Sequence, residues 1–98
     1  MATPLVSVLM TAYNREKYIA EAIESVLASN FKDFELIIVD DCSKDRTAEI
    51  ARRYTSDSRV QVHVNEKNLG DYPNRNRAAS LARGKYLKYL DSDDVIYP

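Results

Sequence analysis

The stretch Lys85-Tyr86-Leu87-Lys88-Tyr89-Leu90-Asp91-Ser92-Asp93-Asp94 decides the expected fold, because it joins an apolar β-strand to a cluster of acids. Its tyrosine and leucine side chains favour a mostly buried sheet position, and we expect Tyr86 and Tyr89 in the core. Parallel strands deliver their carboxyl ends to the crevice where open α/β sheets bind ligands. The stretch therefore predicts an acidic ligand site at the end of a parallel strand.

Asp91, Asp93 and Asp94 crowd three carboxylates into four residues. Two unit charges about 4 Å apart repel by about 4 kcal/mol at an effective dielectric constant of 20. A hard divalent cation would relieve this repulsion, and oxygen ligands suit Mg²⁺ or Mn²⁺. The alternative is a solvated acidic turn, and the spacing alone does not decide between the two.

Three earlier segments also have the character of strands, so we expect strands near residues 5–11, 34–39, 59–64 and 85–90. The first is apolar on both faces, as in a buried parallel strand. The third alternates valine with polar residues, which favours an edge position.

Helices are predicted between these strands. Apolar residues recur at helical spacing from Ile19 to Leu27 and again from Thr47 to Tyr54, and a third helix is expected with Pro73 in its first turn. The candidate caps are Asn14 for the first helix, Ser43 and Asp45 for the second, and a left-handed Gly84 at the end of the third.

The β-α-β-α-β-α-β alternation predicts an α/β fold, with a Rossmann-like parallel sheet, flanking helices and right-handed crossovers. We expect the strand order 3-2-1-4, with residues 1–98 forming one domain. Polar residues would then follow three neighbouring strands, at 11–14, 40–41 and 91–94. Strands lie about 4.8 Å apart, so these ends would span roughly 10 Å, which suits a nucleoside diphosphate.

Composition narrows the function classes. Lys and Arg total 14 against 15 Asp and Glu, a balance without the basic footprint of a nucleic-acid-binding protein. Cys42 is the only cysteine, which excludes an internal disulfide and a cysteine-based zinc site. No signal peptide and no run of about 18 apolar residues is visible. We expect a cytoplasmic protein, with membrane association of a full-length form left open.

The chemistry of the polar side chains near the strand ends indicates several roles. Asp40 or Asp41 could accept a hydrogen bond from a base or a ribose hydroxyl, or could simply complement the dipole of the next helix. Arg75 or Arg77 could pair with a phosphate, or could lie on a solvated helix face. Asn14 could be a cap and nothing more.

Five segments carry a family resemblance in order: VSVLMTAYN (6–14), FELIIVDDCS (34–43), NLG (68–70), ARGKY (82–86) and LDSDD (90–94). Together they resemble the family-two inverting glycosyltransferases of the GT-A fold, over nearly the whole chain. The resemblance implies a nucleoside diphosphate sugar as donor, an acceptor sugar or lipid-linked glycan, a role in cell-envelope or polysaccharide biosynthesis, and Mn²⁺ or Mg²⁺ as cofactor.

The resemblance also implies individual roles. The metal-binding DxD motif falls on Asp91 and Asp93, and the base-contacting acid falls on Asp41. The other nucleotide-binding positions implied are Thr11, Ala12, Tyr13, Asn14, Arg75, Asp91 and Ser92. Cys42 stands where the family usually has glycine, and we expect no positive φ there.

The family's catalytic base lies after the DxD strand, so we expect it beyond Pro98. Residues 1–98 would form the donor-binding part, apparently cut after the DxD motif, inactive alone and prone to self-association through an exposed edge. Two alternatives remain: a nucleotidyltransferase-like enzyme, which would have a Gly-rich basic loop after the first strand, and a non-catalytic nucleotide-binding or assembly module, which would bind without metal.

Overall fold

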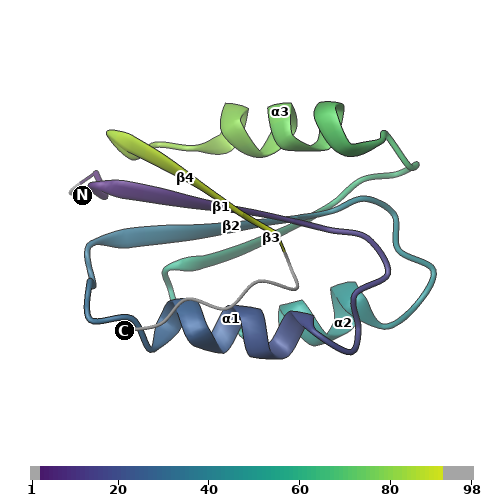
Figure 1. Cartoon of the computed structure of the whole chain (residues 1–98), viewed down its shortest axis with the longest axis horizontal. Helices are drawn as coiled ribbons and strands as arrows, with labels where there is room; N and C mark the ends of the chain where they lie inside the picture. Colours follow the sequence, from purple (N-terminus) through teal and green to yellow (C-terminus); the bar gives the residue numbers. More distant parts are fainter. Residues whose placement is uncertain (1–2, 92–98) are drawn as a thin grey trace.

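A computed structural model describes residues 3–91 of the chain, apart from the side chains of Asp71 and Asp91. The elements are β1 (Val6–Ala12), α1 (Ile19–Leu27), β2 (Phe34–Asp40), α2 (Thr47–Arg52), β3 (Val60–Val64), α3 (Asp71–Leu81) and β4 (Tyr86–Asp91). All strand pairs are parallel, in the order β3-β2-β1-β4. Helix α3 covers one face of the sheet, and α1 and α2 cover the other (Figure 1). The predicted Rossmann-like α/β fold, its strand order and the central place of β1 are confirmed.

The larger part of the core lies between the sheet and helices α1 and α2. Alternate residues of β1 and β2, among them Met10 and Ile38, point toward this side and are fully buried. They meet Ile19, Ile23 and Val26, whose helical spacing places them on one face of α1. Burying a side chain of this size contributes roughly 1.5–3 kcal/mol, so this layer accounts for much of the folding free energy.

A smaller core lies under α3. Leu9, Ile37 and Val39 point to this side of the sheet and pack against Ala78, and all four are fully buried. The short side chain of Ala78 lets the helix backbone lie close to the sheet, as the alanine-rich sequence predicts. The side chains at the carboxyl ends of the strands on this face are therefore held against a well-packed helix.

Strand β4 is less buried than its sequence predicts. Leu90 packs into the core beside Met10, but Tyr86, Leu87 and Tyr89 are 55%, 47% and 47% exposed. Within the described residues β4 pairs with β1 alone, so it forms an edge of the sheet. The prediction that Tyr86 and Tyr89 belong to the core is wrong, because a strand at an edge has neighbours on one side. Self-association through this edge stays a prediction.

Gly84 is needed for a different reason from the one predicted. Helix α3 ends at Leu81, where Ala82 turns to extended geometry (φ −73°, ψ 138°), so Gly84 is not a left-handed cap. A Cβ on Gly84 would instead lie 2.6 Å from both the backbone N and the Oγ of Ser7. The segment that leads into β4 crosses β1 too closely for any side chain.

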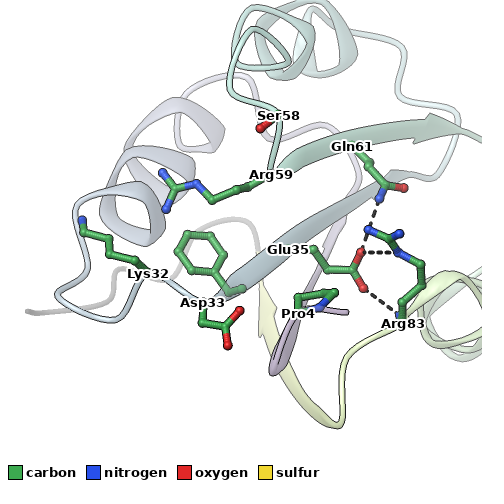
Figure 2. A pocket seen from close by; sticks show the side chains of 9 residues that line it. Pro4, Lys32, Asp33, Glu35, Ser58, Arg59, Gln61 and Arg83 are labelled. Carbon is green, nitrogen blue, oxygen red and sulfur yellow. Dashed lines mark hydrogen bonds and ion pairs between the residues drawn. The ribbon is translucent and has the colours of Figure 1, made fainter. Parts of the chain in front are cut away.

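The amino ends of the strands are tied together by Glu35, which is 3% exposed. Its Oε2 accepts hydrogen bonds from Ser7 Oγ (2.6 Å) and from the Arg83 amide (2.7 Å). Its Oε1 accepts weaker ones from Arg83 Nε (3.3 Å) and Gln61 Nε2 (3.4 Å), as Figure 2 shows. Ser7 Oγ in turn accepts from the Gly84 amide (2.8 Å). One carboxylate thus joins β1, β2 and β3 to the segment before β4.

Candidate functional site

The polar residues expected at the strand ends do meet at one edge of the sheet. Thr11 lies opposite Val39 of β2 and Asp91 of β4, and Ala12 lies opposite Asp40. The ladder continues past the strands, because the Asp41 amide donates to Ala12 O (2.8 Å) and the Asn65 amide donates to Asp40 O (2.9 Å). The backbones of the predicted nucleotide-binding positions on β1, β2 and β4 are therefore neighbours.

The end of β1 changes from buried to exposed over four residues. Thr11 is half-buried, Ala12 is buried, the Tyr13 side chain is 39% exposed, and Asn14 is exposed. Tyr13 thus presents an aromatic face at the carboxyl edge, within reach of solvent.

Asn14 is not the cap of α1, which begins at Ile19 after Tyr18. It adopts left-handed geometry (φ 53°), which asparagine tolerates better than most residues. Its Oδ1 accepts a hydrogen bond from the Lys44 amide (2.8 Å), and its own amide donates to Ser43 Oγ (2.8 Å). The predicted cap is wrong, and Asn14 instead fastens the loop after β1 to the loop after β2.

Ser43 and Asp45, the two caps proposed for the second helix, have different hydrogen-bond partners. Ser43 is held by the buried carboxylate of Asp40, which accepts from the Ser43 amide (2.9 Å) and from Ser43 Oγ (2.5 Å). Asp45 accepts from the amide of Thr47, the first residue of α2 (2.9 Å). Burial raises the pKa of the Asp45 carboxyl, but the hydrogen bonds from Thr47 and the Glu16 amide outweigh this and lower it overall. Helix α2 begins at Thr47 after Arg46, so both predicted N-caps are wrong, although Asp45 still accepts a hydrogen bond from the first amide of the helix.

Asp41 is the anchor of the loop between β3 and α3. Its side chain lies on the α3 side and is 4% exposed. Oδ1 accepts hydrogen bonds from Asn65 Nδ2 (2.8 Å) and the Leu69 amide (2.7 Å), and Oδ2 accepts from the Gly70 amide (3.0 Å). An ionised carboxylate has about four acceptor sites, so roughly one remains, on Oδ2.

Two residues that sequence reasoning missed, Asn65 and Asn74, form a hydrogen-bond network beside this carboxylate, and Arg77, proposed from the sequence for phosphate binding, joins it instead. Asn65 Nδ2 also donates to Asn74 Oδ1 (2.8 Å), Asn74 Nδ2 donates to the carbonyl of Val39 (3.2 Å), and Arg77 Nη1 donates to Asn65 Oδ1. Asn65 and Asn74 are both 3% exposed. The available signal was the spacing of Asn74, Arg77 and Ala78, which puts two polar residues on the face of α3 that carries its buried alanine.

The two arginines proposed for phosphate binding point in different directions. Arg77 is bound to Asn65, on the β3 side of the helix. Arg75 is half-buried, and its guanidinium carbon lies 5.9 Å from the centre of the Tyr89 ring, a cation–π distance. Arg75 is therefore the one beside β4, the strand that ends at Asp91.

The acidic cluster is described only at its first residue. The backbone of Asp91 pairs with Thr11, while Ser92, Asp93 and Asp94 lie outside the described residues. Among the described side chains, no three histidine, cysteine, aspartate or glutamate groups converge in a way that could hold a metal ion. The metal site at Asp91 and Asp93 therefore stays a prediction.

Cys42 contradicts the expectation drawn for it. Its φ is 61°, in the left-handed region that a glycine would occupy without strain. A residue with a Cβ pays roughly 1–2 kcal/mol for this geometry. The thiol gains little in return, since its one hydrogen bond in the described region is a long contact with the Glu66 carbonyl (3.7 Å).

We therefore expect Cys42→Gly to stabilise the chain by up to about 1 kcal/mol, since relief of strain is partly offset by the larger unfolded-state entropy of glycine. Cys42→Val should destabilise it by about 1–2 kcal/mol, because a β-branched side chain fits positive φ poorly. Urea unfolding measures both. A loss of more than 1 kcal/mol in Cys42→Gly would contradict the strained geometry.

A hollow of about 490 Å³ adjoins the hydrogen-bond network around Asp41, at the carboxyl end of β3. It is lined by Val64, Asn65, Glu66, Lys67, Leu69 and Arg77. The carboxyl edge thus combines an exposed tyrosine, a held carboxylate and an open recess, the features expected where an open α/β sheet binds a ligand.

The parallel sheet order and its flanking helices define an α/β domain of the GT-A type. The model of the family "Glycosyl transferase family 2" matches residues 7–98, and the chain belongs to that family. The sequence is 46% identical over 101 residues to an uncharacterized glycosyltransferase of Methanocaldococcus jannaschii, covering 100% of the chain and 35% of the relative. It is 45% identical over 92 residues to TuaG of Bacillus subtilis, named as a glycosyltransferase of teichuronic acid biosynthesis, covering 93% of the chain and 36% of TuaG. The chain thus spans about a third of the length of these relatives.

Solved structures agree with this assignment. The crystal structure of S. aureus TarS (residues 1–349) superimposes with a TM-score of 0.87 at 37% identity, covering 93% of this chain and 28% of TarS. TarS has also been solved with UDP-GlcNAc. The mannosyltransferase PcManGT of Pyrobaculum calidifontis, solved with GDP-Man and Mn²⁺, shares the fold with a TM-score of 0.87 at 22% identity, covering 100% of this chain and 30% of PcManGT. The predicted family and GT-A fold are confirmed.

Over the described part of the chain, no helix has the length and apolar character needed to cross a membrane.

Proposed function

We propose that this chain binds the nucleoside diphosphate part of a sugar donor, in a protein that transfers the sugar to an acceptor hydroxyl with inversion. The observation that carries the proposal is the meeting of Thr11, Asp41 and Asp91 at one carboxyl edge, in a chain of this family. TarS, a structural neighbour at 37% identity, has been solved with UDP-GlcNAc, which supports a nucleotide sugar as ligand.

The proposed donor site uses the edge from β2 to β4. Asp41 accepts an N–H of the base at its remaining Oδ2 acceptor site, and Tyr13 offers its exposed ring beside it. Thr11, Ala12 and Asn14 form the floor at the end of β1, where they and Tyr13 contact the nucleoside. Arg75 and Ser92 serve the diphosphate, because Arg75 lies on the β4 side of α3.

A divalent ion fits the chemistry of the acidic cluster. Asp91 and Asp93 supply carboxylate oxygens, the donors that Mn²⁺ and Mg²⁺ prefer. Asp91 is the last residue of β4, and its backbone lies opposite Thr11 of β1. Asp91 and Asp93 are the residues that would hold the ion. When bound, it supplies Lewis-acid neutralisation of the charge that develops on the leaving diphosphate.

The acceptor side is proposed from chemistry alone. Transfer with inversion needs a general base that deprotonates the acceptor hydroxyl. We propose that this base and the acceptor site lie in sequence beyond Pro98, since the chain spans about a third of its relatives. The acceptor is proposed to be a sugar or a lipid-linked glycan in cell-envelope polysaccharide synthesis, because TuaG is named for teichuronic acid biosynthesis.

A thermal-shift panel tests the donor site. Ligand at 100 times its dissociation constant stabilises a fold by about 2.7 kcal/mol, which raises the melting temperature of a 100-residue domain by roughly 10 °C or more. We expect UDP or GDP with Mn²⁺ to produce such a shift, and the corresponding nucleoside or inorganic diphosphate alone to produce far less. An unchanged melting temperature with every nucleotide would refute the donor site.

A further inference from the structure

We propose that Asn65 is a positioning residue, which orients the Asp41 carboxylate so that its one open acceptor site faces the nucleobase. The inference rests on the proposed donor site, and it assigns a role to a residue outside the predicted site. Asn65 directly follows β3 and is 3% exposed. Its side chain lies between β3 and α3. It donates to Asp41 and Asn74 and accepts a hydrogen bond from Arg77.

The orientation of the Asn65 amide is determined by its partners. Both N–H groups of Nδ2 are used, one by Asp41 Oδ1 and one by Asn74 Oδ1, each at 2.8 Å. Its Oδ1 accepts from Arg77 Nη1, a donor-only group, so the amide cannot flip without opposing donor to donor. Its backbone amide is held by Asp40 O (2.9 Å). Asn65 therefore presents a donor to Asp41 in a single direction.

The partners of Asn65 are themselves anchored. Asn74 donates to the carbonyl of Val39 in β2 (3.2 Å), and the next turn of α3 places Ala78 against the fully buried Val39. A buried, fully satisfied polar network of this kind is rigid, because breaking any bond leaves a polar group unpaired in a medium of low dielectric constant. The position of Asn65 is therefore fixed relative to β2, in the centre of the sheet.

The fixed amide of Asn65 helps to determine the orientation of the Asp41 carboxylate. With Asn65 and the Leu69 amide on Oδ1 and the Gly70 amide on Oδ2, the carboxylate cannot rotate, and the acceptor site that remains is on Oδ2. An acceptor aligned with the ring N–H of uracil or guanine would face the N3 lone pair of cytosine instead, and only the neighbouring exocyclic amine of cytosine could donate to it. Asn65 would therefore act on base discrimination through the orientation that it gives to Asp41.

The test compares dissociation constants of UDP, GDP and CDP by calorimetry with Mn²⁺, in the wild-type chain and in Asn65→Asp, Asn65→Ser and Asp41→Asn. Asn65→Asp is nearly isosteric and can still accept from Arg77, but it replaces the donor to Asp41 with a repelling oxygen. Asn65→Ser removes both N–H donors without adding charge, and it covers the case in which Asn65→Asp does not fold. Asn30→Asp makes the same chemical change at an exposed position before β2 and serves as control.

We expect the wild type and Asn30→Asp to bind the better of UDP and GDP roughly tenfold or more tightly than CDP, the size of one hydrogen bond to a charged group. In both Asn65 variants this ratio should fall toward one, with CDP binding little changed. Equal loss for all nucleotides, or a ratio unchanged in both variants while Asp41→Asn abolishes it, would overturn the role of Asn65 and leave the donor site standing. A wild type without preference, or a preference insensitive to Asp41→Asn, would overturn the base contact itself and the inference with it.

Discussion

Chelation of divalent metal is expected to weaken the binding of UDP or GDP to this chain by roughly 5- to 150-fold, the usual range of coupling between two linked ligands. Without a cation the carboxylates of Asp91, Asp93 and Asp94 repel one another, and a diphosphate brings more negative charge to the same edge. Nucleotide should in turn strengthen metal binding by the same factor, because linkage is reciprocal. Metal alone should bind weakly, since ions of this kind rely on substrate phosphates for several ligands.

Calorimetry of UDP and GDP with Mn²⁺, and then with chelator, measures the coupling. Asp93→Ala should abolish the metal-dependent part, whereas Asp41→Ala should weaken nucleotide binding even at saturating metal. Asp33→Ala is the matched control, because it removes one exposed carboxylate just before β2, at the opposite end of the sheet. Equal affinity with and without metal would refute the metal bridge and make residues 91–94 a solvated acidic turn.

Glu35→Gln is expected to lower the free energy of unfolding by about 2–4 kcal/mol, a large part of the 5–15 kcal/mol typical of a small domain. The amide keeps the size of the side chain but places an N–H₂ group among donors from Ser7 and Arg83. Buried donors left without an acceptor carry the full cost of desolvation. Glu66→Gln makes the same change at an exposed site and should alter stability by no more than about 0.5 kcal/mol.

The effect of Glu35→Gln should depend on pH. Burial raises the pKa of Glu35, but hydrogen bonds from Ser7 and Arg83 and the charge of Arg83 outweigh this, so the pKa lies below its ordinary value of 4.5. A lowered pKa adds stability that is complete above the unfolded-state value and is lost as pH falls through the folded-state value. The difference between wild type and variant, measured by urea unfolding, should therefore shrink as pH is lowered below about 4.5.

Asp57 provides a contrast in the same experiment. Hydrogen bonds from Arg59 lower the pKa of Asp57 to about 2, so the contribution of this pair should be lost only as the pH falls toward 2. A Glu35→Gln penalty that stayed constant from neutral pH to strong acid would contradict the assignment of a stabilising, ionised Glu35.

The sequence was sufficient to predict the order of elements, the strand order 3-2-1-4 and the helical faces of α1 and α2. These depend on apolar periodicity and on the handedness of crossovers, which are local or generic properties. The same reasoning placed Thr11, Asp41 and Asp91 at one edge, because parallel strands end on the same side of a sheet. Ser7, Glu35 and Arg83, by contrast, are far apart along the chain and meet only once the sheet is built.

Only the tertiary structure decided which polar residues serve the fold and which stay open to a ligand. The left-handed geometry of Asn14 and Cys42 and the close approach of Gly84 to β1 are not encoded by any local pattern. Asp40 and Asp41 are adjacent in sequence, yet the alternation of the strand sends them to opposite faces, one to Ser43 and one to Asn65. The hydrogen-bond partners of a buried polar group come from distant segments, and for that reason the network around Asp41 became visible only in three dimensions.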